Sequence, residues 1–223
     1  GEVVAIMGAN GSGKTTLLSL ISGLMRASEG QVVIDGECRK RWKPHHVVGK
    51  VGVVFQNPDL LLQAETVSDE VVFGPRNLKL SGVEISNRRD EVLRAFDLNH
   101  LRTEAPHALS RGQRQRTAIA SIFSLYPGLF LLDEPTTGQD FQHIQQSMRI
   151  LCEDVNRQIR TLIFCTHDTQ LALNYADRVL LLRGGSLIFD GAPLDAFADR
   201  EISEQASLIP PLWMQFKSTF GEG

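Results

Sequence analysis

The chain has 223 residues, of which 42% are hydrophobic, and its formal net charge is −3 at pH 7. A chain of this length buries roughly 70% of its unfolded surface, which is enough for one large domain or for a domain with a sub-domain. The negative net charge argues against a nucleic-acid-binding protein, because such proteins depend on positive surface charge. No run of about 18 apolar residues is present, so no membrane-spanning helix is expected.

The cysteines and the first residues give two further expectations. Cys38, Cys152 and Cys165 have no metal-type spacing, and such a sparse, odd set is typical of buried thiols in a reducing compartment.

The chain starts at Gly1 without a methionine and passes directly into a strand-like apolar run. No signal peptide is visible. We therefore expect further residues upstream, including at least one strand.

The first half of the chain alternates short apolar runs with polar stretches. In chain order, we expect a strand over residues 1–7, a helix over 14–23, a strand over 31–35, a polar loop over 38–50 and a strand over 51–55. Strand character is then lost, and apolar residues recur with helical spacing, for example over 86–96. The sequence therefore predicts a helical sub-domain over residues 59–107, inserted into an α/β core of residues 1–58 and 108–223.

The second half of the chain predicts the rest of that core. We expect a helix over residues 110–124, buried strands over 129–132 and 162–165, and a hairpin of strands over 179–182 and 186–189. Strand–helix alternation of this kind predicts a parallel or mixed sheet covered by helices.

A phosphate-binding loop (P-loop) is predicted between the first strand and the first helix, where the pattern G-x-x-x-x-G-K-[ST] occurs. Its glycines let successive backbone N–H groups point at phosphate oxygens, and the positive end of the next helix faces the same anion. Lys14 supplies positive charge to the β- and γ-phosphates, and the Thr15 hydroxyl is a ligand for Mg²⁺. The expected ATP-binding residues are Gly8, Ala9, Asn10, Gly11, Ser12, Gly13, Lys14, Thr15 and Thr16.

Two carboxylates follow the apolar strand over residues 129–132. A buried strand that ends in Asp133 brings this carboxylate to the edge of the sheet where nucleotides bind. Asp133 is therefore expected to hold Mg²⁺, through a water molecule. Glu134 can accept a hydrogen bond from the attacking water and polarise it. Together with the phosphate loop, these residues predict a P-loop NTPase.

Further segments stand in a defined order around these two motifs. Gln56 follows a strand, the signature-like run 109–113 (Leu-Ser-Arg-Gly-Gln) precedes a helix, residues 135–140 (Pro-Thr-Thr-Gly-Gln-Asp) follow Glu134, and His167 follows a strand. This order resembles the nucleotide-binding domain of ABC ATPases over nearly the whole chain. The resemblance implies an ATP hydrolase that uses Mg²⁺ and works as a head-to-tail pair of domains.

The resemblance also implies roles for individual residues. Gln56 corresponds to the Q-loop glutamine, which binds Mg²⁺ and ATP and senses the membrane partner. Asp140 corresponds to the D-loop aspartate at the seam between the two domains, and His167 to the switch histidine that contacts the γ-phosphate. The signature motif, which reaches the γ-phosphate held by the other domain, corresponds to Ser110, Arg111, Gly112 and Gln113.

The sequence departs from the family pattern at three points. Arg111 stands where the signature motif usually has glycine, and Gln139 stands where the D-loop usually has leucine. The aromatic residue that stacks on adenine lies well before the phosphate loop in this family, and no such residue precedes Gly8. We expect it in a segment upstream of Gly1.

Two segments resemble the ATPases of energy-coupling-factor (ECF) importers, which take up vitamins or cobalt and nickel ions. Residues 56–59 read Q-N-P-D, and residues 66–78 are similar to the ECF pattern T-V-x-x-D-V-A-F-G-P-x-N-L. The proline-containing segment 208–213 is similar to the short tail of the same group. The implied partners are a second ATPase domain, a transmembrane coupling protein and a membrane substrate-binding component, at the cytoplasmic face of the membrane. No nucleic acid is expected.

Other functions remain open at this point. A soluble ABC ATPase of translation or DNA repair shares every core motif, although such proteins usually carry two linked domains, coiled-coil insertions or zinc insertions. An ABC importer or exporter outside the ECF group is a second alternative. A catalytically weak interaction subunit is a third, for which Arg111 and Gln139 would be the marks. A small-molecule kinase would share only the phosphate loop.

Overall fold

The computed structural model describes residues 1–39, 42, 47, 49–136, 138, 141–158, 160–211 and 214. Its centre is a six-stranded sheet with the strand order β4-β5-β6-β1-β7-β8. Neighbouring strands from β4 to β7 in this order pair in parallel, and the edge strand β8 pairs antiparallel with β7. The strands are β1 (Val3–Met7), β4 (Val51–Val54), β5 (Leu129–Asp133), β6 (Thr161–Cys165), β7 (Arg178–Arg183) and β8 (Ser186–Gly191).

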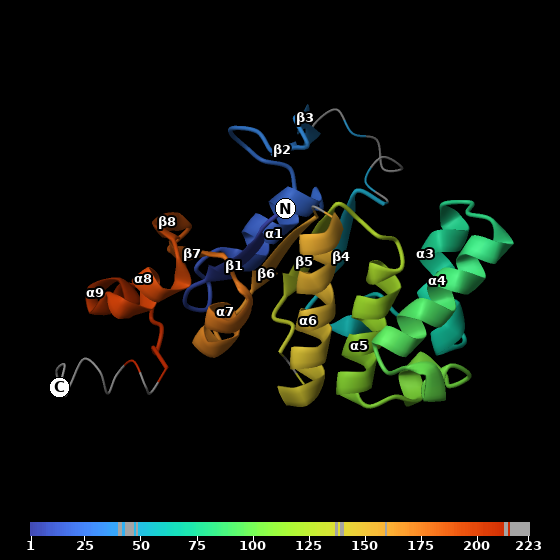
Figure 1. Ribbon diagram of the computed structural model, residues 1–223. Coiled ribbons are helices and arrows are strands. Elements are labelled where there is room, and N and C mark those ends of the chain that lie inside the picture. The colour runs from blue at the N-terminus through green and yellow to red at the C-terminus, as the bar shows by residue number, and fades with distance from the viewer. Residues whose placement is uncertain are drawn as a thin grey trace.

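Helices cover both faces of this sheet, which explains why β1 and β5 are buried at every position. On one face, Leu18 of α1 (Lys14–Ser22) belongs to the same apolar cluster as Ile6 and Leu131. On the other face, Met148 belongs to a larger cluster with Phe164. That face carries α6 (Phe141–Gln158) and α7 (Thr169–Tyr175), which lie in front of the sheet in Figure 1. The predicted mixed α/β sheet is therefore confirmed.

A group of helices follows β4 and lies beside it in Figure 1. In this group α3 (Val67–Asn77) packs against both α4 (Gly82–Ala95) and α5 (Arg111–Phe123), and α5 also packs against β4. Side chains of Thr66, Ser81 and Ser110 cap the three helices by accepting a backbone N–H of the first turn. Helix α5 thus joins the helical layer to the sheet. A short 3-10 turn, η2 (Pro58–Leu60), precedes α3, and two more, η3 (Asn99–Leu101) and η4 (Pro106–Ala108), lie between α4 and α5.

The strand predicted over residues 31–35 does not join the main sheet. Instead β2 (Val33–Ile34) pairs antiparallel with β3 (Glu37–Cys38) in a separate two-stranded sheet. Asp35 and Gly36, which connect these strands, both have positive φ angles of 52° and 74°. An Asp-Gly pair favours such a tight hairpin, so the chain turns back at once. Cys38, expected in a loop, is consequently part of a strand.

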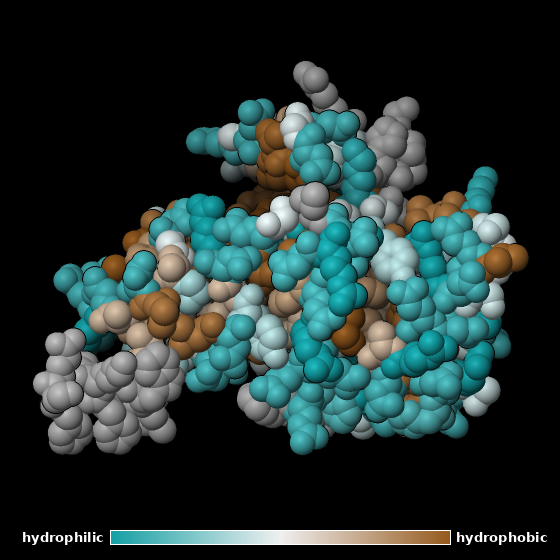
Figure 2. Space-filling view, viewed as in Figure 1, coloured by the Kyte–Doolittle hydropathy of each residue, from teal (hydrophilic) through white to brown (hydrophobic). Residues whose placement is uncertain are grey.

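The C-terminal part contains the predicted hairpin and two short helices. Strands β7 and β8 are joined by Gly184 and Gly185, as expected, and α8 (Pro193–Ala198) and α9 (Arg200–Gln205) follow. Figure 2 shows mainly hydrophilic residues over the outward faces of α4 and α6. Among the described residues, no helix is long and apolar enough to span a bilayer.

Candidate nucleotide-binding site

The phosphate loop connects β1 to α1, and close backbone contacts fix its shape. A Cβ atom on Gly8, whose φ angle is 145°, would lie 2.2 Å from the carbonyl oxygen of Leu182 in β7. Only glycine fits at this position, both for space and for backbone conformation. The N–H of Gly185 donates to the carbonyl oxygen of Ser12 at 2.9 Å, so the β7–β8 turn supports the loop from the other side.

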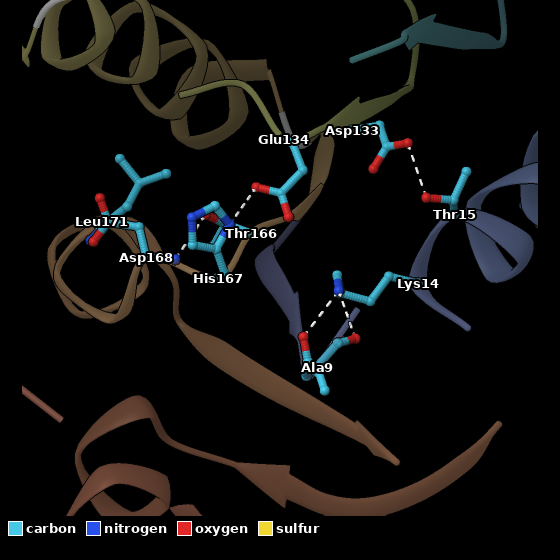
Figure 3. Close-up of polar contacts among 10 residues, drawn as sticks. Ala9, Lys14, Thr15, Asp133, Glu134, Thr166, His167, Asp168 and Leu171 are labelled. Carbon is cyan, nitrogen blue, oxygen red and sulfur yellow. Dashed lines mark hydrogen bonds and ion pairs between the residues drawn. The ribbon is translucent and has the colours of Figure 1, made fainter. Parts of the chain in front are cut away.

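Lys14 is folded back over this loop. Its Nζ atom donates to the carbonyl oxygens of Gly8 at 2.9 Å and Ala9 at 3.1 Å (Figure 3). The residue is only 7% exposed. In the described part of the chain Lys14 forms no ion pair with a carboxylate, and its Nζ hydrogen bonds go to neutral carbonyl oxygens. The Ser12 hydroxyl is buried beside the loop without a hydrogen-bond partner. A cation hydrogen-bonded only to neutral carbonyls and an unsatisfied hydroxyl at a helix N-terminus fit a phosphate group.

Thr15 and Asp133 form a second cluster at the same end of the sheet. The Thr15 hydroxyl donates to Oδ2 of Asp133 at 3.0 Å, and the carboxylate is almost fully buried. Asp133 is the last residue of β5, so the sheet fixes its position. A hydroxyl and a carboxylate are the hard oxygen ligands that Mg²⁺ prefers, and these two residues therefore fit the metal that accompanies ATP.

Glu134 follows Asp133 directly and turns away from it. Its φ angle of 47° lies in the left-handed region, which is unfavourable for a residue with a side chain. The N–H of Glu134 donates to the carbonyl oxygen of Cys165 at 3.0 Å, which holds the turn against the end of β6. As a result the two carboxylates face different partners: Figure 3 shows Thr15 beside Asp133 and His167 beside Glu134.

His167 reaches Glu134 from the end of the neighbouring strand. Its Nδ1 atom lies 3.0 Å from Oε2 of Glu134. The backbone on both sides of His167 is fixed, because the N–H of Thr166 donates to the carbonyl oxygen of Ile6 and the N–H of Asp168 donates to the Thr166 hydroxyl. The Asp168 carboxylate accepts the N–H groups of Gln170 and Leu171, which caps α7.

The residues of the signature-like run form a separate group at the start of α5. Ser110 and Gln113 form a capping box: the N–H of each donates to the side chain of the other, at 2.9 Å and 3.3 Å. Gly112 is partly buried, whereas Ser110 and Arg111 are exposed. Across the described residues, no hydrogen bond or ion pair joins this group to the phosphate loop. The structure does not bring the predicted signature residues and the phosphate loop together within one chain.

Gln56 is exposed at the end of β4. It lines a cavity of about 450 Å³, together with Asn57, Pro58, Asp59, Arg111 and Arg114. Arg114 and Asp59 form an ion pair at 2.8 Å on its wall. The predicted Q-loop residue is thus close to the signature-like run of the same chain. Asp140, predicted at the seam between two domains, lies outside the described residues, as do Thr137 and Gln139.

Several residues that shape the site were not predicted. Thr166 and Asp168 fix the backbone of His167, and Leu182 and Gly185 support the phosphate loop. Only Asp168 carries a local signal, because an aspartate directly before a helix is a typical N-cap. The others act through backbone atoms or through contacts that are distant in sequence.

Comparison with known proteins identifies the family. The model of the ABC transporter family matches residues 1–137. The chain belongs to the ABC transporter ATPases. The predicted family, the P-loop fold and the use of ATP with Mg²⁺, which is common to this family, are therefore confirmed.

Curated relatives cover nearly the whole of this ABC ATPase chain. An ABC transporter ATP-binding protein of Methanosarcina mazei is 45% identical over 99% of this chain and 37% of its own length. The first relatives are all much longer, and the chain spans about a third of them. The energy-coupling factor transporter ATP-binding protein EcfA of Methanococcus maripaludis is 42% identical over 95% of this chain and 76% of its own length.

Two solved structures resemble this ABC ATPase closely. The first is cbiO1 from Clostridium perfringens, described as part of the ABC transporter complex cbiONQ, with a TM-score of 0.81 and 33% identity. That alignment covers 97% of this chain and 87% of cbiO1. The second is a dimeric ATP-binding cassette in a post-hydrolysis state with ADP and phosphate, with a TM-score of 0.77 and 30% identity. That alignment covers 86% of this chain and 85% of the other protein.

Proposed function

We propose that this chain is the Mg-ATP-hydrolysing engine of an ECF-type importer and acts at the cytoplasmic face of the membrane. The observation that carries the proposal is the placement of two carboxylates at the end of β5. Asp133 lies against Thr15 and the phosphate loop, whereas Glu134 lies against His167. One carboxylate is thus available for the metal and the other for the water that attacks the γ-phosphate.

In this proposal the phosphate loop binds the nucleotide. The Nζ atom of Lys14 would exchange its two carbonyl acceptors for oxygens of the β- and γ-phosphates, which are stronger acceptors because they are charged. The buried Ser12 hydroxyl would gain the partner that it lacks in the free chain. Thr15, Asp133 and Gln56 are the proposed Mg²⁺ ligands, and the metal would neutralise charge on the phosphate oxygens.

In this proposal Glu134 and His167 promote hydrolysis. Glu134 is held with its carboxylate at the rim of the nucleotide site, where it can accept a hydrogen bond from water and orient it toward the γ-phosphate. The His167 side chain is 71% exposed, so it has room to turn toward a phosphate oxygen and donate to it. The strained backbone at Glu134 is typical of a position kept for function rather than stability.

A second ATPase domain is needed to complete the site. The signature-like run begins a helix, and its exposed Ser110 makes no contact with the phosphate loop of its own chain. We infer that Ser110, Arg111, Gly112 and Gln113, with Asp140, face ATP held by the other domain. Two ATP molecules would then be sandwiched between two domains, and closure would move the Gln56 loops against the membrane partner. The dimeric solved structure with ADP and phosphate supports this arrangement.

The ECF assignment rests on similarity to EcfA proteins and to cbiO1. It implies a transmembrane coupling protein and a membrane component that binds a vitamin or a metal ion. The second ATPase domain is an identical chain, a paralogue or another part of a longer protein. The length of the Methanosarcina relatives supports the last of these.

The test is a pull-down of the tagged full-length protein from mild-detergent extracts of its native membranes, with bound proteins identified by mass spectrometry. Recovery of a polytopic coupling protein together with a small membrane substrate-binding protein is the expected result. Recovery of ribosomal or DNA-repair proteins without any membrane protein would overturn the transport function and would favour a soluble ABC ATPase.

A further inference from the structure

An ion pair connects the segment after Gln56 to the helix that begins at the signature-like run. The Nε atom of Arg114, the fourth residue of α5, lies 2.8 Å from Oδ1 of Asp59 in η2. Asp59 follows Gln56 by three positions, and both residues line the same cavity as Arg114. The connection between the Gln56 loop and α5 therefore runs entirely through residues that the structure describes.

The Arg114 side chain also fixes the turn that precedes Ser110. Its Nη1 atom donates to the carbonyl oxygen of Leu109 at 2.6 Å, and the backbone N–H of Arg114 donates to the carbonyl oxygen of Ser110 at 2.9 Å. Leu109 is itself buried. One planar guanidinium group thus holds the backbone just before Ser110 and faces Asp59 at the same time, a geometry that the point charge of a lysine does not reproduce.

Asp59 is in turn held by its own segment. Its backbone N–H donates at 3.2 Å to Oδ1 of Asn57, the residue that follows Gln56. Farther along the chain, the buried carboxylate of Glu70 in α3 accepts the backbone N–H groups of residues 63–64 at 2.7 and 2.8 Å. The position of the Asp59 carboxylate therefore depends on the position of the Gln56 loop.

The exposure of this ion pair favours a role in positioning over a role in stability. The Arg114 and Asp59 side chains are 24% and 56% exposed, and exposed ion pairs contribute little to folding. The pair does, however, set where the guanidinium lies relative to the turn before Ser110. A movement of the Gln56 loop would carry Asp59 with it, and would thereby move the charge that orients Arg114.

We propose that Arg114 is a positioning residue that couples the Gln56 loop to the signature-like run: Asp59 orients the guanidinium, and the guanidinium holds the backbone before Ser110. The consequence for hydrolysis rests on the proposed function, in which Ser110 contacts ATP held by the other domain, whereas the ion pair itself does not. When the pair is lost, Ser110 is placed less well against that ATP, although nucleotide still binds to the phosphate loop.

Variants of the full-length protein test this coupling through ATP hydrolysis. Asp59→Asn and Arg114→Met each remove one charge and keep a side chain of similar size. Each should lower kcat about tenfold and leave the dissociation constant for ATP within twofold, because no contact in the described part of the chain joins the ion pair to the phosphate loop. Asp59→Glu keeps the carboxylate and should stay within threefold of the wild-type kcat. Glu204→Gln, which removes one charge of an exposed ion pair on α9, is the matched control and should leave kcat unchanged.

The double variant Asp59→Asn/Arg114→Met distinguishes one shared link from two independent effects. Its kcat should lie within about threefold of that of the slower single variant, because both substitutions interrupt the same link. A combined loss of about a hundredfold would overturn the proposal, and so would single variants whose kcat stays within twofold of the wild type. A tenfold loss of affinity for ATP in either single variant would also overturn it, since the phosphate site would then be disturbed.

Charge reversal tests the contact without using activity. Asp59→Lys places two cations together and should lower the midpoint of chemical denaturation in the wild type. In the Arg114→Glu background the same substitution restores opposite charges and should raise the midpoint. Shifts of equal size and sign in both backgrounds would mean that the side chains do not meet, and would overturn the proposal. If the wild type itself does not hydrolyse ATP, the proposed function fails, and this measurement still decides on the contact.

Discussion

The Nδ1 atom of His167 and the Oε2 atom of Glu134 are 3.0 Å apart, although 33 positions separate the two residues in the chain. They meet because β5 and β6 are adjacent and parallel, so both strands end at the same edge of the sheet. The Glu134 side chain is 11% exposed and that of His167 is 71% exposed. The pair therefore consists of a fixed carboxylate and an imidazole that is free to move.

Replacement of both members of this pair should not multiply the losses of the single variants. His167→Ala is expected to lower kcat at least tenfold, because the proposed donor to the γ-phosphate is lost. The double variant His167→Ala/Glu134→Gln should have a kcat no more than about threefold below that of Glu134→Gln alone. The losses of residues that act as a unit do not add. Single-turnover measurements on the four proteins check this. If the losses in kcat of the two single variants multiply fully in the double variant, the contact does not contribute to catalysis.

Lys14→Ala should weaken ATP binding without unfolding the protein. The substitution removes a cation whose hydrogen bonds go only to backbone carbonyls in the free chain, and hydrogen bonds to charged groups are worth about 1.5–3 kcal/mol each. The dissociation constant for ATP should rise at least tenfold in a fluorescence titration. Arg26→Ala, an exposed cation outside the site, serves as the control. Unchanged affinity in the Lys14 variant would contradict the assignment of the phosphate loop.

Gly8→Ala should destabilise the fold far more than the same change at another left-handed glycine. At Gly8 the new Cβ would meet the Leu182 carbonyl at 2.2 Å, whereas at Gly30, with φ of 71°, it would meet nothing within 4 Å. Gly30→Ala should cost only the backbone strain of about 1 kcal/mol, and Gly8→Ala at least about 3 kcal/mol. Thermal melting compares the two. Equal shifts would mean that the loop does not pack on β7.

Cys152 and Cys165 should resist alkylation in the folded protein. Burial raises the pKa of the Cys152 thiol to about 12 and raises that of Cys165 further, with nearby Asp133 adding to the shift at Cys165. At pH 8 both thiols are therefore protonated, and their thiolate fraction is far below that of an ordinary cysteine. Mass spectrometry after brief iodoacetamide treatment should find both unmodified. Denaturation should make them reactive, and modification of Cys165 in the native protein would contradict the fold.

The features that could be predicted from sequence share a local origin. The P-loop, the strand ending in Asp133 and Glu134, and the hairpin over Gly184 and Gly185 each have a pattern within a few residues, and each was found in the structure. The pairing of Glu134 with His167 could not be predicted from residue patterns alone, because it depends on which strands are neighbours. Only the family resemblance suggested that both residues act on the same phosphate.

The features that were missed depend on contacts between distant parts of the chain. The strand expected over residues 31–35 became half of a small separate hairpin, because Asp35 and Gly36 adopt a tight turn. A short apolar run predicts a strand but does not tell which sheet the strand joins. The packing of Arg111 on Gly138 and of Gly8 under Leu182 likewise has no local signal. These contacts follow from the tertiary arrangement of α5 and β7.

The most direct test of the central claim compares Mg-dependent phosphate release by the full-length protein and its Glu134→Gln variant. An exposed glutamate variant, Glu29→Gln, is the control. If Glu134 polarises the attacking water, its replacement should slow turnover at least a hundredfold while ATP stays bound, because the loss of one such group costs about 3 kcal/mol of barrier. Turnover of the Glu134→Gln variant within tenfold of the wild type would contradict the account.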